Sequence, residues 1–271
     1  MSYQLQKIVI YPVKSLGGIG LTQARVGDRG LQYDRRYMIV DSNGLFITQR
    51  KFPQLSQIKM MQHAGGFIAT YRNNNRDNKI EIPFEPEYHG FIEATVWDDV
   101  FVVSLTDPVY SEFFSDFLKM DVRLVYMPDS TSRFYNTPKI VNHGITSLAD
   151  AYPLLLIGTA SLDDLNSKLD RPVSMDRFRP NLIVSTQVPF EEDNFGQFRI
   201  AGQHFISVKQ CSRCIMTTVD TSTGIMGKEP LKTLSVYRMI GNKVMFGMNI
   251  APVGHNSTLS CGDHLFVDRQ Q

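Results

Sequence analysis

Residues 91–105 read Phe-Ile-Glu-Ala-Thr-Val-Trp-Asp-Asp-Val-Phe-Val-Val-Ser-Leu. The stretch consists of two short runs, Phe91–Val96 and Val100–Leu105, around the polar turn Trp97-Asp-Asp99. Runs rich in β-branched and aromatic residues on either side of a turn predict a β-hairpin. This segment therefore indicates antiparallel β-structure in the first part of the chain.

The same pattern of short strands and turn residues recurs toward the N-terminus. Turn signals every ten or so residues are typical of an antiparallel sandwich or barrel. A polar loop has no apolar side chain to bury, so it separates strands rather than joining the core. The predicted segments are the strand Leu5–Tyr11, the strand Tyr37–Val40 with its turn Asp41–Gly44 and return strand Leu45–Thr48, and the strands Phe67–Tyr71 and Lys79–Ile82 around the polar loop Asn73–Asn78.

Helical spacing appears only after these strands. Val109–Leu118 carries Phe residues at helical intervals, Ser161 and Asp164 form a capping-box pattern, and Pro230 is placed to open a third helix. Strand-like runs then resume. They are Leu182–Ser185, Phe205–Val208, Val244–Met248 and His264–Val267.

These elements predict a mostly β fold with several helices, of the α+β class. A segment rich in Ser, Thr, Pro and Asn, Met127–Asn142, is the natural place for a domain boundary. We therefore expect two domains, residues 1–125 and residues 126–271. The first is expected to be an antiparallel, β-barrel-like domain packed on the second.

Composition limits the classes of protein to consider. The 271 residues include 28 Lys and Arg against 27 Asp and Glu, and this balance predicts no nucleic-acid-binding surface. No apolar run is long enough for a membrane span, and the N-terminus lacks a signal-peptide pattern. Three cysteines cannot build a dense disulfide framework. The expected location is the reducing cytoplasm, without a membrane anchor.

Cys211-Ser-Arg-Cys214 is the first segment that could carry chemistry. A thioredoxin-like motif would need a surrounding βαβ unit, which is absent, and the following residues 215–219 are β-prone. A zinc site would need Cys261 and His264 as well, at an unusual spacing. The two cysteines could also be small buried hydrophobic residues. Arg213 favours the functional alternatives, because a neighbouring cation stabilises the thiolate.

Several short basic segments accompany this motif. Arg177 and Arg179 lie in Asp176–Asn181, and a guanidinium group offers a planar pair of donors for phosphate oxygens. The structural alternative is a solvated loop whose arginines pair with the acidic residues 191–193. Lys14 and Ser15 precede a Gly-rich turn. Asp34-Arg-Arg36 and Thr48-Gln-Arg50 add cations that could equally be surface charge.

Taken together, these segments are much more specific than any one alone. The chain resembles MOSC-domain proteins preceded by their N-terminal β-barrel domain, including the mitochondrial amidoxime-reducing component and bacterial MOSC reductases of N-hydroxylated compounds. The similarity covers nearly the whole length. It is carried by Tyr-Pro-Val-Lys-Ser15, Asp34-Arg35, Phe178-Arg-Pro-Asn181, Cys211-Ser-Arg-Cys214-Ile-Met-Thr-Thr-Val-Asp220 and Gly224 followed by Glu229-Pro-Leu-Lys-Thr-Leu234, in this order.

The resemblance implies a molybdenum–molybdopterin cofactor whose metal is held by the thiolate of Cys214, the catalytic ligand. A soft thiolate ligand suits such a metal, and Lys, Arg, Ser and Asn suit a phosphate and a polar pterin. The site would lie in a cleft between the two domains. The cofactor-binding positions implied are Lys14, Ser15, Arg35, Asp150, Ala151, Tyr152, Arg179, Asn181, Ser212, Arg213 and Asn249.

The activity implied is reduction of small N-hydroxylated substrates such as hydroxylamines, amidoximes and N-hydroxylated bases. The cysteine set of a fused ferredoxin domain is absent, so a separate ferredoxin, flavodoxin or flavoprotein would supply electrons. Asp220 is a candidate proton donor, although capping the turn that follows it is the simpler role.

Two other classes of function stay open. One is a carrier that holds the molybdenum cofactor, or a sulfur atom on a cysteine, and passes it on. No cysteine-desulfurase-like domain is fused here, so this pyridoxal-phosphate-independent chain would need a partner for transfer. The other is a thiol-redox or zinc protein that uses Cys211 and Cys214.

Overall fold

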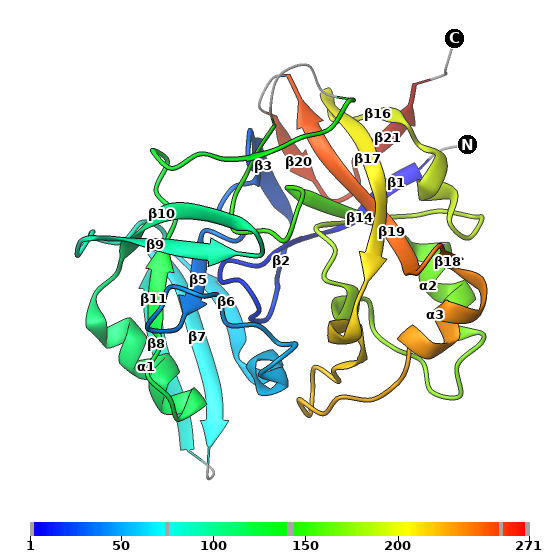
Figure 1. Cartoon of the computed structure of the whole chain (residues 1–271). Coiled ribbons are helices and arrows are strands. Elements are labelled where there is room, and N and C mark those ends of the chain that lie inside the picture. Colours follow the sequence, from blue (N-terminus) through cyan, green and yellow to red (C-terminus); the bar gives the residue numbers. More distant parts are fainter. Residues whose placement is uncertain (1–2, 74–75, 140–143, 255–256, 269–271) are drawn as a thin grey trace.

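A closed ring of seven β-strands forms the larger of two lobes in the computed structural model, which describes residues 3–73, 76–139, 144–254 and 257–268 (Figure 1). Strands β14 and β15 pair in parallel, the remaining pairs are antiparallel, and β19 pairs with β14 to close the ring. In ring order the strands are β14 (Leu154–Gly158), β15 (Leu182–Val184), β1 (Tyr3–Ile10), β21 (His264–Val267), β16 (Gln197–Ile200), β17 (Gln203–Arg213) and β19 (Lys243–Val253).

Apolar residues from all parts of the chain fill this ring. Leu5 and Ile8 on β1, Leu156 on β14, and Phe198 and Phe205 on neighbouring strands are fully buried in one core cluster. Two short strands extend the sheet without closing it: β2 (Ile19–Leu21) pairs with β1, and β18 (Met239–Ile240) pairs with β19.

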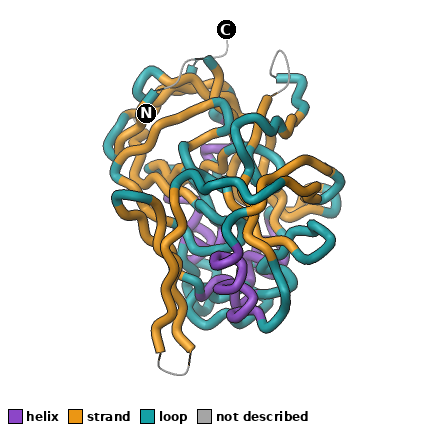
Figure 2. Tube along the Cα trace, turned by 90° about the vertical axis from the view of Figure 1, so that its left-hand side faces the viewer, coloured by secondary structure: helices purple, strands orange, loops and turns teal. Residues whose placement is uncertain are grey.

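The second lobe, at the left in Figure 1, is built from smaller antiparallel sheets. It contains the predicted hairpin, because β9 and β10 pair through six residue pairs on either side of Trp97. Figure 2 shows the β7–β8 hairpin as a long ribbon that ends away from the rest of the chain. The sheets are β5 (Tyr37–Val40), β11 (Arg123–Tyr126), β10 (Asp99–Leu105) and β9 (Phe91–Val96), and β6 (Lys59–His63), β7 (Gly66–Asn73) and β8 (Arg76–Pro83).

Two further sets of short strands complete the β-structure and confirm the mostly β class. Two of these strands, β3 and β20, join the beginning of the chain to its end. Their order is β20 (Thr258–Ser260), β3 (Gln23–Gly27) and β4 (Gly30–Leu31) in one sheet, and β12 (Arg133–Tyr135) with β13 (Gly144–Thr146) in the other.

Three α-helices occur among the described residues: α1 (Pro108–Leu118), α2 (Thr159–Asn166) and α3 (Leu231–Tyr237). Asp107 caps α1 by accepting a hydrogen bond from the Val109 amide, as short acidic side chains do at helix N-termini. Each helix in the described part of the chain is too short or too polar to cross a lipid bilayer.

Two local predictions were wrong, since tertiary contacts changed the outcome. Ser161 does not cap α2, which begins at Thr159; its hydroxyl instead donates to the carboxylate of the buried Glu192. The polar segment 73–78 is largely strand, because β7 runs to Asn73 and β8 begins at Arg76. Residues 74–75 of that segment lie outside the described part.

Two further segments form less strand than their composition indicates. The return strand Leu45–Thr48 forms isolated bridges only, although the Asp41 amide donates to Leu45 and that of Ile47 donates to Ile39. The β-prone residues after Cys214 form the 3-10 turn Ile215–Thr218, since β17 ends at Arg213.

Sheet pairing crosses the predicted division at residues 125 and 126. Strand β1 lies between β15 and β21, so Tyr3–Ile10 belongs to the ring that strands of the second half mostly form. Part of the expected boundary segment, residues 140–142, lies outside the described residues. The division stays a prediction, and the pairing gives a direct reason why both halves meet at one cleft.

Candidate functional site

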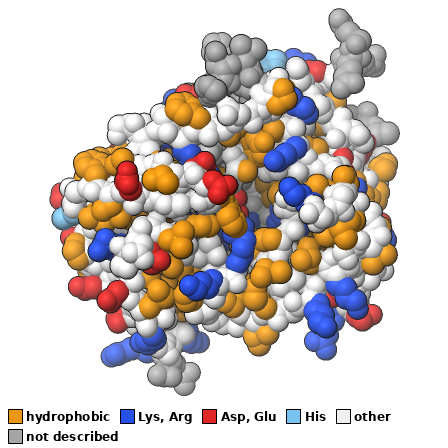
Figure 3. Space-filling model, in the orientation of Figure 1, with side chains coloured by type: hydrophobic (Ala, Val, Ile, Leu, Met, Phe, Trp, Pro, Cys, Tyr) orange, Lys and Arg blue, Asp and Glu red, His pale blue; other side chains and the backbone are white. Residues whose placement is uncertain are grey.

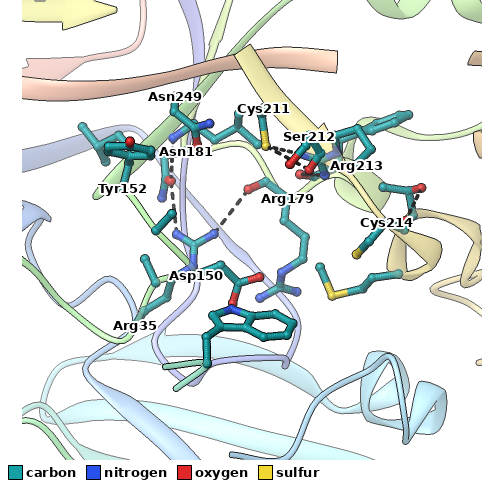
Figure 4. A pocket seen from close by; sticks show the side chains of 18 of the residues that line it. Arg35, Asp150, Tyr152, Arg179, Asn181, Cys211, Ser212, Arg213, Cys214 and Asn249 are labelled. Carbon is teal, nitrogen blue, oxygen red and sulfur yellow. Dashed lines mark hydrogen bonds between the residues drawn. The ribbon is translucent and has the colours of Figure 1, made fainter. Parts of the chain in front are cut away.

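A cavity of about 440 Å³ lies between the two lobes. Figure 3 shows a hollow in this face of the molecule with basic side chains gathered at it. All twelve residues predicted for the site line the cavity, and Figure 4 labels nine of them. They are Lys14, Ser15, Arg35, Asp150, Ala151, Tyr152, Arg179, Asn181, Ser212, Arg213, Cys214 and Asn249.

The lining is strongly basic, although the whole chain is nearly neutral. One carboxylate, Asp150, faces seven Lys and Arg side chains among the described lining residues. Low-dielectric walls concentrate the field of such a set of charges, so the cavity favours an anionic occupant. The seven cations are Lys14, Arg35, Arg50, Arg179, Lys209, Arg213 and Lys243.

Asp150 joins two of these cations. The Lys14 Nζ donates to Asp150 Oδ1 at 2.5 Å and to the Leu148 carbonyl at 2.8 Å, and the Arg50 Nη2 donates to Asp150 Oδ2 at 2.6 Å. Burial lowers the pKa of Lys14 to about 8 even though Asp150 opposes the shift. Lys14 and Arg50 in turn hold the pKa of the Asp150 carboxyl well below its usual range.

A second group of cations is stacked on Tyr11. The guanidinium of Arg179 lies 4.1 Å from the ring centre of Tyr11, and that of Arg35 lies 4.7 Å from it. Arg35 also pairs with the buried Asp34 and donates to Asn181 Oδ1 at 3.1 Å. Burial raises the pKa of the Tyr11 hydroxyl to about 12, so it stays neutral between the two arginines.

Two arginines leave buried donor atoms without a protein partner. Among the described residues, the Nη2 of Arg179 and the Nε of Arg213 have no hydrogen-bond partner, while other atoms of these groups donate to the carbonyls of Leu16 (2.6 Å) and Phe178 (2.7 Å). Burial lowers the pKa of Arg179 to about 10. An unsatisfied buried donor is costly, so these atoms fit a ligand that supplies acceptor oxygens.

Backbone strain also concentrates at the cavity. Ser15, Arg35 and Arg179 have φ angles of 71°, 50° and 56°, in the left-handed region that favours glycine. Such conformations cost about 1 kcal/mol or more each and often occur at binding sites. Arg179 ends the 3-10 turn Met175–Phe178, and its backbone conformation changes the direction of the chain shortly before β15 begins at Leu182.

Cys214 follows the end of β17 and starts the 3-10 turn that the next four residues form. Its Sγ accepts a hydrogen bond from the Arg50 Nε at 3.2 Å, and the side chain is half-buried. The Sγ of Cys211 accepts from the Arg213 Nη1 at 3.0 Å. Each sulfur of the Cys-Ser-Arg-Cys segment therefore accepts a hydrogen bond from its own guanidinium group.

Small polar residues complete the lining. Asn181 is almost fully buried, and its side chain donates to the Val9 carbonyl at 3.1 Å and accepts from the Leu155 amide at 3.2 Å. Asn249 on β19 lies opposite Lys209 of β17 on one side and Leu155 of β14 on the other. These contacts tie the cavity wall to the closed ring of strands.

The structure does not show the alternative predicted for the basic loop 176–181, in which its arginines pair with the acidic residues 191–193. Arg177 pairs with Asp220 at 2.8 Å rather than with residues 191–193. Asp220 caps the turn that follows it by accepting from the Ser222 hydroxyl and from the amides of Ser222 and Thr223, and these hydrogen bonds lower the pKa of its carboxyl. A carboxyl held ionised in this way does not suit the role of proton donor.

A zinc site of the expected type is absent from the part of the chain that the structure describes. No group of three His, Cys, Asp or Glu side chains is placed there to hold a metal ion. Cys261 lies at the end of β20, where its amide donates to the Thr22 carbonyl, and it does not line the cavity. Cys211 and Cys214 therefore do not share a site with it.

Several lining residues escaped the sequence analysis. The sequence alone indicates Arg50 only as a cation that could equally lie on the surface, and Trp97 only as a turn residue. The guanidinium of Arg50 lies 4.6 Å from the indole centre of Trp97 and also donates to the Cys214 sulfur, and all three residues line the cavity. The signal available in the sequence was a Trp, the only one in the chain, within a short polar turn. Lys209, Lys243 and Met216 carried none.

Comparisons with known proteins cover nearly the whole chain. The MOSC N-terminal beta barrel domain matches residues 2–121, and the MOSC domain matches residues 143–266. The mitochondrial amidoxime-reducing component 1 of Danio rerio is 32% identical over 88% of this chain and 75% of its own length. The mitochondrial amidoxime reducing component 2 of Rattus norvegicus is 31% identical over 97% and 82%.

A second kind of relative shares the same two domains as part of a longer chain. The molybdenum cofactor sulfurase of Oryza sativa subsp. japonica is 30% identical over 98% of this chain but over only 35% of its own length, so the chain spans about a third of that relative. Both the domain matches and the amidoxime-reducing relatives extend across the two lobes that enclose the cavity. This chain belongs to the MOSC family, with an N-terminal MOSC β-barrel domain and a MOSC domain.

Proposed function

We propose that this protein is a molybdenum-cofactor-dependent reductase that removes oxygen from small N-hydroxylated substrates. The observation that carries the proposal is the position of Cys214, whose sulfur faces a basic cavity in which buried donors of Arg179 and Arg213 lack partners. The names of the amidoxime-reducing relatives support the class of reaction. The proposed substrates are hydroxylamines, amidoximes and N-hydroxylated bases.

The donor set fits the proposed cofactor, molybdenum bound to molybdopterin. A thiolate is a suitable soft ligand for such a metal, and the Cys214 side chain lines the cavity beside the Arg50 guanidinium. The phosphate of the cofactor needs charged donors, which the unpartnered atoms of Arg179 and Arg213 supply. Asn181, Ser212 and the other polar lining residues suit a pterin ring, which carries both donors and acceptors.

When bound, the metal centre would supply the two-electron chemistry that converts R–NH–OH, two electrons and two protons into R–NH₂ and water. The protein's own part is binding and orientation. Arg50 holds the sulfur of Cys214 from the first lobe, and Arg213 holds the end of β17 by donating to the Phe178 carbonyl. Arg179 and Lys14 would neutralise the anionic end of the cofactor.

The electrons are proposed to come from a separate ferredoxin, flavodoxin or flavoprotein. An exchangeable donor protein needs a site that opens to solvent, and the cavity reaches the surface between the lobes in Figure 3. The three cysteines are free, which agrees with the proposed cytoplasmic location.

Replacing Cys214 by Ala tests the proposal. We expect bound molybdenum to fall to background and reduction of benzamidoxime to be lost, because the variant lacks the metal ligand. Metal analysis by mass spectrometry, combined with the fluorescence of the oxidised pterin, measures the first effect on protein made in a host that synthesises the cofactor.

Cys211→Ser is the matched control, since its sulfur lies three positions away on the same motif. This variant should keep substantial molybdenum and activity. Unchanged metal content in the Cys214 variant would remove the hypothesis. An equal loss in both variants would favour a paired-cysteine mechanism, and one equivalent of zinc without molybdenum would favour a zinc protein.

A carrier of the cofactor, or of a sulfur atom, is the second candidate. The similarity to a molybdenum cofactor sulfurase favours it, because that match covers almost all of this chain. A turnover assay of the cofactor-loaded protein, with reduced viologen as the electron donor, distinguishes the two candidates. A carrier would bind molybdenum through Cys214 without turning over amidoximes, whereas a reductase would turn them over.

A further inference from the structure

Trp97 occupies an unusual position at the tip of the β9–β10 hairpin. It is the only tryptophan in the chain, its backbone lies in the left-handed region at φ 57°, and it lines the cavity. A bulky residue is strained in that conformation, and strain of this kind persists where surrounding contacts fix it. The side chain is 49% exposed. A large apolar surface is therefore held open at the mouth of a basic cavity.

The ring is fixed by contacts on two sides. The Arg50 guanidinium lies 4.6 Å from the indole centre, and Phe46 makes an edge-on contact at 5.2 Å and 67°. Arg50 is itself anchored by Asp150 at 2.6 Å and by the Cys214 sulfur at 3.2 Å. Arg50 thus lies between the indole and the Cys214 sulfur and fixes their relative position, while about half of the indole surface stays exposed.

We propose that Trp97 is a specificity-determining residue, a platform on which the flat ring of an aromatic N-hydroxylated substrate stacks. The inference rests on the proposed reductase function and adds a preference for planar substrates over small aliphatic ones. A rigid, half-exposed indole offers a π-face to any flat ring, and stacking of this kind contributes substantially to binding. The charged lining around it attracts polar groups but does not distinguish a flat ring from an aliphatic chain.

The alternative is that Trp97 acts only through Arg50, as a positioning residue that supports the Cys214 sulfur. The two roles differ in what they predict for substrates of different shape. A platform affects the KM of planar substrates, because an aliphatic group has no ring to stack. A support for Arg50 affects all substrates alike, because the contact with the sulfur is common to every turnover.

The experiment compares benzamidoxime with acetamidoxime on cofactor-loaded wild type, Trp97→Ala and Trp97→Phe. Removing the indole should raise the KM for benzamidoxime about 10-fold or more, within the range expected for loss of one aromatic stack, and raise that for acetamidoxime far less. Trp97→Phe keeps an aromatic ring, so its KM for benzamidoxime should lie close to that of the wild type. Phe91→Ala is the matched control, because Phe91 is also exposed on this hairpin but does not line the cavity.

Binding without turnover gives a second measurement. The emission of the only tryptophan reports on the cavity mouth, so benzamidoxime should quench it and acetamidoxime at the same concentration should not. The inference would be overturned if Trp97→Ala raised the KM for both substrates equally, or if the wild type turned over benzamidoxime without a change in tryptophan emission. Either result would leave the proposed reductase function standing. A wild type that reduces neither substrate would overturn both proposals.

Discussion

Single buried charges give the cavity its chemical character. Lys14 is almost fully buried, and Asp150 is the only carboxylate among the described residues that line the same cavity. The cost of burying the ammonium group outweighs the attraction of Asp150, so the pKa of Lys14 falls to about 8. Folding therefore disfavours the protonated form of this side chain, which is the form that would bind an anion.

This pKa shift makes stability depend on pH in a defined direction. Between pH 8 and pH 10.5 the unfolded chain keeps the Lys14 proton that the native chain has lost, so stability from this group should rise with pH. The rise is limited to about 1.4 kcal/mol per pH unit. Urea unfolding across this range should show the free energy of unfolding of the wild type increasing relative to Lys14→Arg, which stays charged throughout. A constant difference between the two proteins would contradict the shift.

At the scale of elements, the pairing of β17 with β19 shapes the cavity wall. The register shifts between Gln210 and Ser212, where two residues of β19 lie opposite one residue of β17. Gly247, at φ 79°, occupies this irregularity. A bulge of this kind bends a strand and redirects its side chains. The bulge immediately precedes Arg213 and Cys214, so the backbone of β19 helps to place both.

Gly247→Ala should destabilise the protein by more than a positive φ alone explains. A Cβ there would lie 2.7 Å from the Ile157 Cγ1 and 3.1 Å from the Leu156 carbonyl oxygen. Gly202 has nearly the same φ, 78°, with nothing within 4 Å of an added Cβ, so Gly202→Ala is the matched control. We expect the free energy of unfolding to fall by about 1 kcal/mol in the control and by about 2 kcal/mol more in Gly247→Ala. Equal values in denaturant unfolding would show that the clash relaxes without cost.

At the scale of the whole molecule, the cavity is a place where two lobes contribute one set of charges. Lys14, Arg35 and Arg50 come from the first part of the chain, and Arg179 and Arg213 come from the second. An anion between them would bind only the native state, because the unfolded chain separates these residues. Ligand binding and stability are then linked.

Inorganic phosphate should therefore raise the thermal midpoint of the protein lacking cofactor in a saturable way. At ten times its Kd the stabilisation is about 1.4 kcal/mol, which corresponds to a Tm shift of about 4 °C. Arg179→Gln should lose most of this shift. Arg199→Gln is the control, since Arg199 pairs with Asp268 on the surface away from the cavity. The same rise in all three proteins, measured by scanning calorimetry, would indicate a general salt effect instead.

Much of the fold could be predicted from local pattern. The hairpin at residues 91–105 formed as expected, since alternating β-branched residues around a polar turn specify their partner directly. The capping pattern at Ser161 failed, because Glu192, distant in sequence, offered its hydroxyl a better partner. Local pattern likewise gave no sign that β1 closes a ring formed mostly by the second half.

The sequence by itself determined the strand-rich class, the order of the basic segments and the Cys-Ser-Arg-Cys motif, because these depend on neighbouring residues. Only the tertiary structure decided that Arg50 contacts both Cys214 and Trp97, and that Arg179 and Arg213 have buried donors without a partner among the described residues. The hydrogen bond between Arg50 and Cys214 joins residues 164 positions apart. Their geometry follows from how the closed ring and the second lobe pack, which no local spacing encodes.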